Sequence, residues 1–185
     1  PSAEARKVSA PTTGKIFLGE EEITNQPPSL IVHKGLARSF QIPAYFPEYT
    51  VFENIHTGVL NHLGYAYNFF KNAAELQDVN DQTDVLIDRL GLEDKRDLKS
   101  KYLSHGDKKI LDIAMSLTLE PDIMLLDEPT SGVSGPDRMA VIKFIEKLAE
   151  NVKVVIVEHD MDIVFGICER VVVMYQGTIL ADGTL

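Results

Sequence analysis

The feature that most constrains this chain is a run of four apolar residues, 123–126, followed at once by two carboxylates, Asp127 and Glu128. Such a run is typical of a buried parallel strand, and Pro129 and Gly132 end it. In open α/β sheets, ligands bind at the carboxyl ends of the strands. Asp127 is therefore a candidate ligand of Mg²⁺, and Glu128 is a candidate base for an attacking water. The alternative is that the pair only caps the next turn.

The composition is that of an ordinary globular chain with a negative net charge. Its 185 residues, 44% hydrophobic and 25% charged, are enough for one domain. The net charge of −10 argues against nucleic acid as the main partner, because phosphate backbones bind clustered Lys and Arg. No apolar run approaches the roughly 18 residues of a membrane span, so a membrane role requires a partner. The one cysteine, Cys168, lies among apolar residues and is expected to be a core thiol.

The periodicity of the chain predicts an α/β fold that an all-helical stretch interrupts. A capping box of Thr50 and Glu53 starts a helix that extends to about residue 63. Strands that alternate with helices predict a parallel sheet with right-handed crossovers. The other expected elements are strands at 15–18, 36–40, 152–157, 171–175 and 178–181, and helices at 29–34, 69–77, 81–90, 107–119, 136–150 and 161–169.

A second candidate site lies at the start of the helix predicted at 107–119. Ser104 and Gly106 precede this helix, and its free backbone amides, together with Lys108 and Lys109, would form an anion site. The alternative is an ordinary helix with a capping box in which an aspartate replaces the usual glutamate.

Two further polar residues follow predicted strands. His159 lies two residues after the end of the predicted strand 152–157, where it can hydrogen-bond a phosphate or a water. The alternative is a purely structural role. Gln41 follows the strand 36–40, and its amide is able to bridge a metal-bound water. The loop 41–49 carries three aromatic residues, which predict a docking surface unless they fold back on the core.

Taken together, the order of these motifs resembles the ATP-binding cassette family, the nucleotide-binding subunits of ABC transporters. The resemblance covers residues 11–185 and implies a P-loop NTPase-like α/β core with an inserted helical subdomain. It implies that Gln41 is the Q-loop residue, that 103–107 is the signature motif and that 131–137 is the D-loop. It also implies that Asp127 is the Walker B carboxylate near Mg²⁺, Glu128 the catalytic carboxylate and His159 the switch histidine.

Finer details are similar to one branch of that family. Residues 37–41, 46–54 and the long helical region 60–101 resemble the branched-chain amino acid importers. The signature also resembles that of the related urea and short-amide importers. His105 and Asp107 stand where the family usually has Gly and Gln, and the D-loop is loose, so we interpret these departures as variation within the branch.

The resemblance implies an ATPase that works as part of a membrane complex. ATP and Mg²⁺ are the implied cofactors, with Gln41 and Asp127 near the metal and Ser104 and Gly106 touching the ATP of a second cassette in a head-to-tail dimer. The loop 41–49 would contact transmembrane permease subunits at the cytoplasmic face of the membrane. The implied parts are 1–50, a remnant of the N-terminal ATP-binding core; 51–119, the helical subdomain with the signature; and 120–185, the C-terminal part of the core.

One expected motif is absent from this sequence. The phosphate-binding loop requires G-x-x-x-x-G-K-[ST], and the only Gly-Lys pair, Gly14-Lys15, does not match it. We expect the first strands and this loop to lie upstream, and the chain alone to bind ATP poorly and hydrolyse it negligibly. Two alternatives remain open: a cassette ATPase that acts on DNA or ribosomes, which the acidic net charge disfavours, and an interaction module that works without nucleotide.

Overall fold

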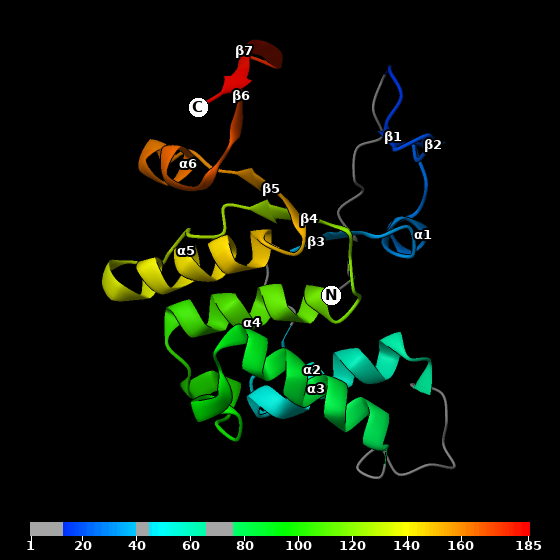
Figure 1. The fold of residues 1–185 in the computed structure, drawn as a ribbon, viewed down its shortest axis with the longest axis vertical. Coiled ribbons are helices and arrows are strands. Elements are labelled where there is room, and N and C mark those ends of the chain that lie inside the picture. Colours follow the sequence, from blue (N-terminus) through cyan, green and yellow to red (C-terminus); the bar gives the residue numbers. More distant parts are fainter. Residues whose placement is uncertain (1–12, 40–44, 66–75) are drawn as a thin grey trace, which may run out of the picture.

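The computed structural model describes residues 13–39, 45–65 and 76–185. At its centre lies a parallel sheet of three strands, β3 (Leu36–Arg38), β4 (Ile123–Asp127) and β5 (Lys153–Val157), in the order β3-β4-β5 (Figure 1). The predicted parallel sheet is confirmed, and its middle strand is the apolar run that ends at Asp127. Gln41 and residue 40 of the predicted strand 36–40 lie outside the described residues.

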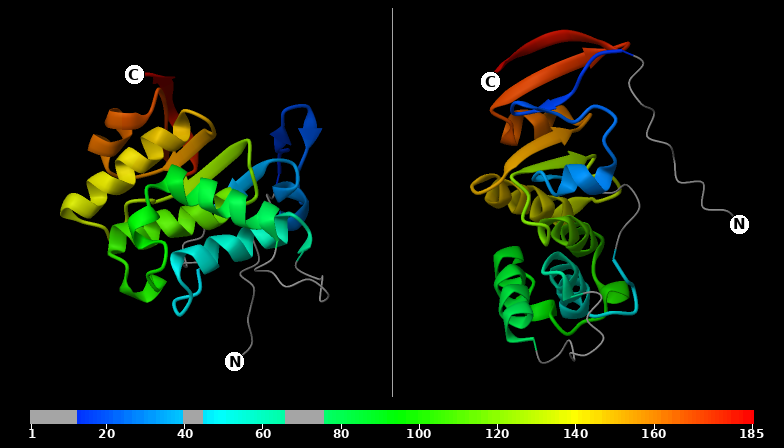
Figure 2. Two further views of the ribbon diagram at one scale, coloured as in Figure 1. Left: turned by 60° about the horizontal axis from the view of Figure 1, so that its bottom comes forward. Right: turned by 90° about the vertical axis from the view of Figure 1, so that its right-hand side faces the viewer.

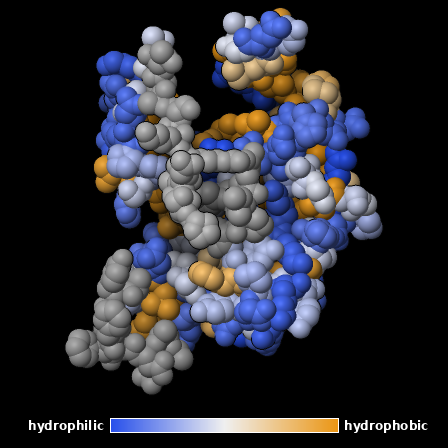
Figure 3. All heavy atoms as spheres, turned by 180° about the vertical axis from the view of Figure 1, so that it is seen from behind, coloured by the Kyte–Doolittle hydropathy of each residue, from blue (hydrophilic) through white to orange (hydrophobic). Residues whose placement is uncertain are grey.

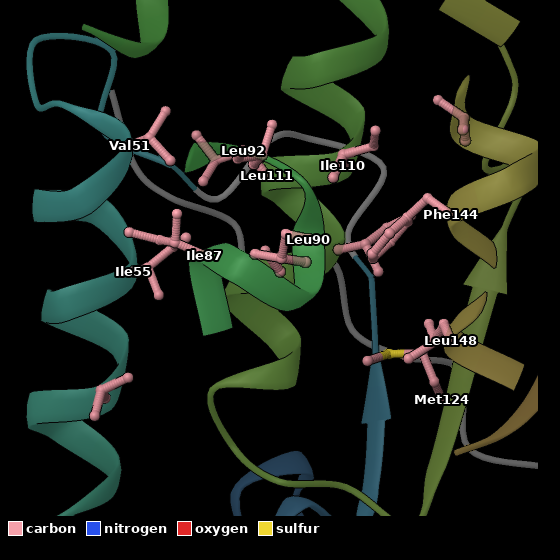
Figure 4. Packing of buried hydrophobic residues seen from close by; sticks show 14 of the residues in the cluster. Val51, Ile55, Ile87, Leu90, Leu92, Ile110, Leu111, Met124, Phe144 and Leu148 are labelled. Atoms are coloured by element: carbon pink, nitrogen blue, oxygen red, sulfur yellow. The ribbon is translucent and has the colours of Figure 1, made fainter. Parts of the chain in front are cut away.

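One face of this sheet is covered by α4 (His105–Leu117) and α5 (Gly135–Ala149), which pack against each other, with α4 contacting β3 and α5 contacting β5 (Figures 1 and 2). Side chains alternate along a strand, so Met124 and Leu126 of β4 point toward the helices and are buried. In Figure 4, Met124 lies beside Leu148 of α5. These contacts anchor the strand that carries Asp127 and Glu128.

The core continues from the sheet into the helical part of the chain. The helices α2 (Val51–His62) and α3 (Gln77–Leu90) pack against α4, so one apolar cluster joins them to α5 and the sheet (Figure 4). Among its most deeply buried side chains are Val51, Ile55, Val79, Ile87, Leu111, Ile113, Met124, Leu126, Val141 and Ile145. Two short 3₁₀ turns, Glu93–Lys95 and Ser100–Tyr102, lead from α3 to α4.

The ends of α2 and α3 follow the local rules that predicted them. The capping box at the start of α2 is complete: Glu53 N donates to Thr50 Oγ1 at 3.1 Å, and Thr50 N donates to Glu53 Oε2 at 2.7 Å. Gly91 ends α3 with a left-handed φ of +65°. α3 begins at Gln77, earlier than the predicted helix 81–90, because buried residues continue the same apolar face toward its start. The predicted helix at 69–77 otherwise lies outside the described residues.

The remaining elements lie near the two ends of the chain. The predicted C-terminal hairpin is confirmed as β6 (Arg170–Tyr175) paired with β7 (Thr178–Thr184). The strand β7 extends beyond residue 181, where Arg170 Nη2 donates to Asp182 Oδ2 at 2.6 Å across the pair. In the described residues β6 pairs only with β7, so the parallel sheet ends at β5. The elements are β1 (Phe17–Leu18) paired with β2 (Glu21–Glu22), α1 (Pro28–Val32), α6 (Met161–Ile167), β6 (Arg170–Tyr175) and β7 (Thr178–Thr184).

Candidate functional site

The carboxyl ends of β4 and β5 bring two predicted site residues together. Asp127 lies opposite Val157 in the parallel register, and Glu128 and His159 follow just beyond this pair. The Nδ1 atom of His159 lies 3.5 Å from Oε1 of Glu128. Both side chains are solvent-accessible, so the sheet edge offers a carboxylate and an imidazole to a ligand from solution.

Glu128 has an unusual backbone conformation. Its φ of +46° lies in the left-handed region, which non-glycine residues rarely occupy. The conformation is held from both sides: Glu128 N donates to Val157 O at 2.9 Å, and Ser131 N donates to Glu128 O at 3.1 Å. Strained residues of this kind concentrate at functional sites, so the conformation supports a role for this carboxylate beyond capping a turn.

A third carboxylate, Glu158, was not predicted from the sequence and organises this edge. Its side chain is only 1% exposed. It accepts hydrogen bonds from Thr130 Oγ1 at 2.7 Å, from Thr130 N at 3.2 Å and from His159 N at 3.3 Å. Glu158 therefore ties the turn after Glu128 to the segment that carries His159. The only signal in the sequence is a glutamate directly after an apolar strand, and this pattern is equally compatible with an exposed surface residue.

Asp127 is paired with a cation in this structure. Arg38 Nη2, at the end of β3, lies 2.8 Å from Asp127 Oδ2, and the Asp127 side chain is 23% exposed. Magnesium is usually held by one or two carboxylates together with substrate phosphates and waters, so Asp127 fits a metal that arrives with a nucleotide. Among the described residues, no group of three or more His, Cys, Asp or Glu side chains is arranged to hold a metal ion.

The start of α4 contacts another part of the chain instead of lying free. Ser104 Oγ accepts a hydrogen bond from Asp107 N at 3.1 Å, as predicted. The prediction that the Asp107 side chain accepts a hydrogen bond from the Ser104 backbone, as in a full capping box, is wrong. The Asp107 carboxylate instead lies 2.6 Å from Lys95 Nζ. Gly106 N donates to Asp137 Oδ2 at 3.2 Å. One backbone amide of the predicted anion site is therefore already hydrogen-bonded to a carboxylate of the same chain.

Gly106 is also where α4 and α5 approach each other closely. A Cβ atom at this position would lie 2.9 Å from the Asp137 carbonyl oxygen and 3.0 Å from the Asp137 Cβ. The next residue, Arg138, forms an ion pair with Asp160, the N-cap of α6. Arg138 thereby lowers the pKa of Asp160. The first turn of α5 thus contacts both the start of α4 and the segment that follows His159.

The predicted site residues therefore fall into two groups. Glu128, His159 and Asp127 share one edge of the sheet, whereas Ser104 and Gly106 lie at the start of α4, on the other side of α5 (Figure 1). No hydrogen bond or ion pair between described residues joins one group to the other.

The aromatic loop is described from Tyr45 onward, and buried Asn54 holds it in place. Asn54 accepts from Phe46 N at 2.6 Å and donates to Ser100 Oγ at 2.8 Å. Phe46 and Tyr49 remain 48% and 45% exposed, with ring centroids 5.1 Å apart. These two rings therefore do not fold back completely on the core.

Comparison with known proteins decides the family. The model of the ABC transporter family matches residues 6–131. This chain belongs to the ABC transporter family. The high-affinity branched-chain amino acid transport ATP-binding protein LivG of Escherichia coli strain K12 is 32% identical over 184 residues, 94% of this chain and 71% of LivG. BraF of Pseudomonas aeruginosa, named for the same transport, is 33% identical over 94% of this chain and 71% of its own length.

A solved ABC cassette has the same fold. A nucleotide-free ATP-binding cassette from an ABC transporter superposes with a TM-score of 0.78 at 28% identity, over 94% of this chain and 70% of that structure. The fold is therefore the P-loop NTPase-like α/β fold of ABC cassettes, as predicted. In the described part of this ABC cassette, no helix is both long and apolar enough to cross a bilayer.

Proposed function

We propose that this chain is part of the ATP-binding subunit of an ABC importer for branched-chain amino acids or a related small polar solute such as urea or short amides. The observation that carries the proposal is the contact between Glu128 and His159 at the carboxyl edge of the sheet, 3.5 Å apart. The similarity to LivG and BraF supports the class of solute. In this proposal the intact protein hydrolyses ATP.

The chemistry assigned to the edge is activation of water. Glu128 orients or deprotonates the attacking water, and His159 hydrogen-bonds the terminal phosphate of ATP. Asp127 would hold Mg²⁺, together with Gln41, which lies outside the described residues. When bound, the ion would supply positive charge to the phosphates. Arg38 forms an ion pair with Asp127, so a bound Mg²⁺ would have to share this carboxylate with the guanidinium group or displace it.

The separation of the two groups of site residues supports a dimer. Ser104 and Gly106, at the start of α4, lie apart from Glu128 and His159, and this separation supports the proposal that they contact the nucleotide of a second cassette rather than their own. Each ATP is then enclosed between the two cassettes of a head-to-tail dimer. Binding closes this dimer only if ATP has a higher affinity for the closed state.

The exposed aromatic loop is assigned to the permease. Phe46 and Tyr49 present apolar surface in the described part of this loop, so in this proposal closure around the nucleotide is transmitted to a transmembrane subunit through the loop 41–49. The cassette then lies at the cytoplasmic face of the membrane without entering it. We assign 51–119 to a helical subdomain with the signature, and 1–50 and 120–185 to the two flanking parts of the ATPase core.

The test is Glu128→Gln in the assembled transporter. Removal of a general base lowers the hydrolysis rate about 10²–10⁴-fold, while ATP still binds and ATP-bound dimers accumulate. The control is Glu146→Gln, an exposed position on α5 that leaves hydrolysis unchanged. Hydrolysis by the Glu128 variant at the control rate, or ATP-bound protein that stays monomeric in size-exclusion chromatography, would contradict the assignment.

A second test concerns the 185-residue chain by itself. Without the glycine-rich loop it lacks an amide cradle and a lysine for the phosphates, so we expect weak binding of Mg-ATP. Isothermal titration calorimetry measures the affinity directly. A dissociation constant in the micromolar range would show that the 185-residue chain holds the nucleotide unaided, and would refute this expectation.

A further inference from the structure

The place of His159 in the candidate site depends on its backbone. Its side chain is 75% exposed, with Nδ1 lying 3.5 Å from Oε1 of Glu128 and 3.8 Å from Oε2 of Glu158. An imidazole with so little packing around it is placed by the backbone of residues 158–160. A misplacement of about 1 Å in a reacting group can cost about a hundredfold in rate, so the contacts that hold this segment matter for the proposed chemistry.

One end of this short segment is fixed by Glu158. The Glu158 carboxylate accepts hydrogen bonds from Thr130 Oγ1 at 2.7 Å and from His159 N at 3.3 Å, and the side chain is buried. These bonds join the residue ahead of His159 to the turn that follows Glu128. The residue on the other side of His159 is Asp160, so the contacts of Asp160 decide whether the segment is held at both ends.

The part of the chain that begins at Asp160 is weakly packed. Asp160 caps α6 by accepting a hydrogen bond from Asp162 N at 3.0 Å, but α6 buries only Ile163 of its described residues. The next element, the β6–β7 hairpin, adds little support, because Met174 is 67% exposed and Figure 3 shows hydrophobic atoms at the surface of this hairpin. A polar contact from a well-anchored element therefore has a large share in fixing Asp160.

That contact comes from Arg138, in the first turn of α5. Arg138 forms an ion pair with Asp160, and the two side chains are 35% and 32% exposed, so solvent screens the pair only in part. The helix α5 is itself well anchored, because Val141, one turn further along, is fully buried. Its first turn is also tied to α4, since Gly106 N donates to Asp137 Oδ2 at 3.2 Å. Arg138 therefore holds Asp160 from an element that has a fixed place in the core.

We propose that Arg138 is a positioning residue for the water-activating pair. It holds Asp160, and Asp160 fixes the backbone next to His159. Glu158 holds that backbone from the other side, so the two contacts together keep the imidazole within reach of Glu128. Arg138 takes no part in the reaction itself and acts through Asp160. The inference rests on the proposed function and gives a role in it to a residue outside every motif predicted from the sequence.

The first measurement is ATP hydrolysis by the assembled transporter. Arg138→Ala should lower kcat about ten- to a hundredfold and leave KM for ATP within about twofold, because the residue aligns a reacting group and does not bind the nucleotide. Asp160→Asn should lower kcat equally, since asparagine still caps α6 but carries no charge. Arg138→Lys keeps the cation and should restore most of the rate. The matched control is Lys143→Ala, which removes an exposed cation from the same helix.

The second measurement is hydrogen exchange, followed by mass spectrometry in the same transporter without nucleotide. Residues 159–164 should exchange about tenfold faster in Arg138→Ala, whereas α5 should keep the wild-type rate. A residue with a purely structural role would loosen α5 as well. Asp160→Asn decides the question should Arg138→Ala fail to assemble, because it removes only the charge of the pair.

Three results would overturn the inference. The first is a kcat for Arg138→Ala equal to that of Lys143→Ala. The second is a fall in kcat while residues 159–164 exchange at the wild-type rate, and the third is an Arg138→Lys variant no faster than Arg138→Ala. Failure of the proposed function is seen separately, as hydrolysis by the Glu128→Gln variant at the control rate.

Discussion

The most informative perturbation is Glu158→Ala, because this carboxylate joins the two strand ends that form the candidate site. Its removal leaves the amide and hydroxyl groups of Thr130, a residue only 7% exposed, without their acceptor. A buried donor left unsatisfied costs about 1–3 kcal/mol. The hydroxyl group can rotate toward another acceptor, so we expect a loss of about 2–4 kcal/mol in the free energy of unfolding.

Urea denaturation at 25 °C followed by circular dichroism measures this loss. With a slope of about 2 kcal/mol per molar urea, the midpoint should fall by about 1–2 M. Glu146→Ala, at an exposed position on α5, is the control and should change stability by less than about 0.5 kcal/mol. Glu158→Gln, which keeps one acceptor oxygen, should lie between the two. Equal midpoints for the variants at 158 and 146 would refute the reasoning that Glu158 holds the edge together.

The other predictions concern helix contacts and pH. Gly106→Ala should destabilise the chain by about 1–3 kcal/mol in urea denaturation, because the new Cβ would lie 2.9 Å from the Asp137 carbonyl oxygen and force α4 from α5; an unchanged midpoint would contradict this close approach. Ile55→Ala removes a side chain that is 0% exposed and should cost about 2–5 kcal/mol in the same assay; a cost below that of a surface substitution would argue against the packing of α2. Arg138 lowers the pKa of Asp160, so this carboxylate stabilises the fold fully above the value of about 3.9 for a free aspartate, and the contribution disappears as pH falls through the lowered pKa. Wild type and Asp160→Asn should accordingly differ in thermal midpoint at pH 6, and this difference should shrink as the pH falls through the lowered pKa of Asp160; a constant difference would rule out the ion pair as its cause.

The elements that could be predicted from the sequence are those whose signals are local. Four consecutive apolar residues indicated β4, and the capping box of Thr50 and Glu53 marked the start of α2. The β2 strand was not expected, since its two glutamates have no apolar pattern and pair with β1 only through the backbone. The sequence pattern did not predict the extra length of β7 either, because this length depends on a cross-strand ion pair between Arg170 and Asp182.

The candidate site shows the same difference between features with a local sequence signal and contacts between distant residues. The sequence alone determined that Asp127, Glu128 and His159 would reach one edge, because parallel strands carry whatever follows them to the same side of a sheet. The tertiary structure decided which partners these and neighbouring side chains found: Arg38 for Asp127, Thr130 for Glu158 and Asp137 for Gly106. Those pairs join residues from different elements, and their distances depend on how helices and strands pack. Periodicity in a sequence records which face of an element is buried, but not which distant residue lies against it.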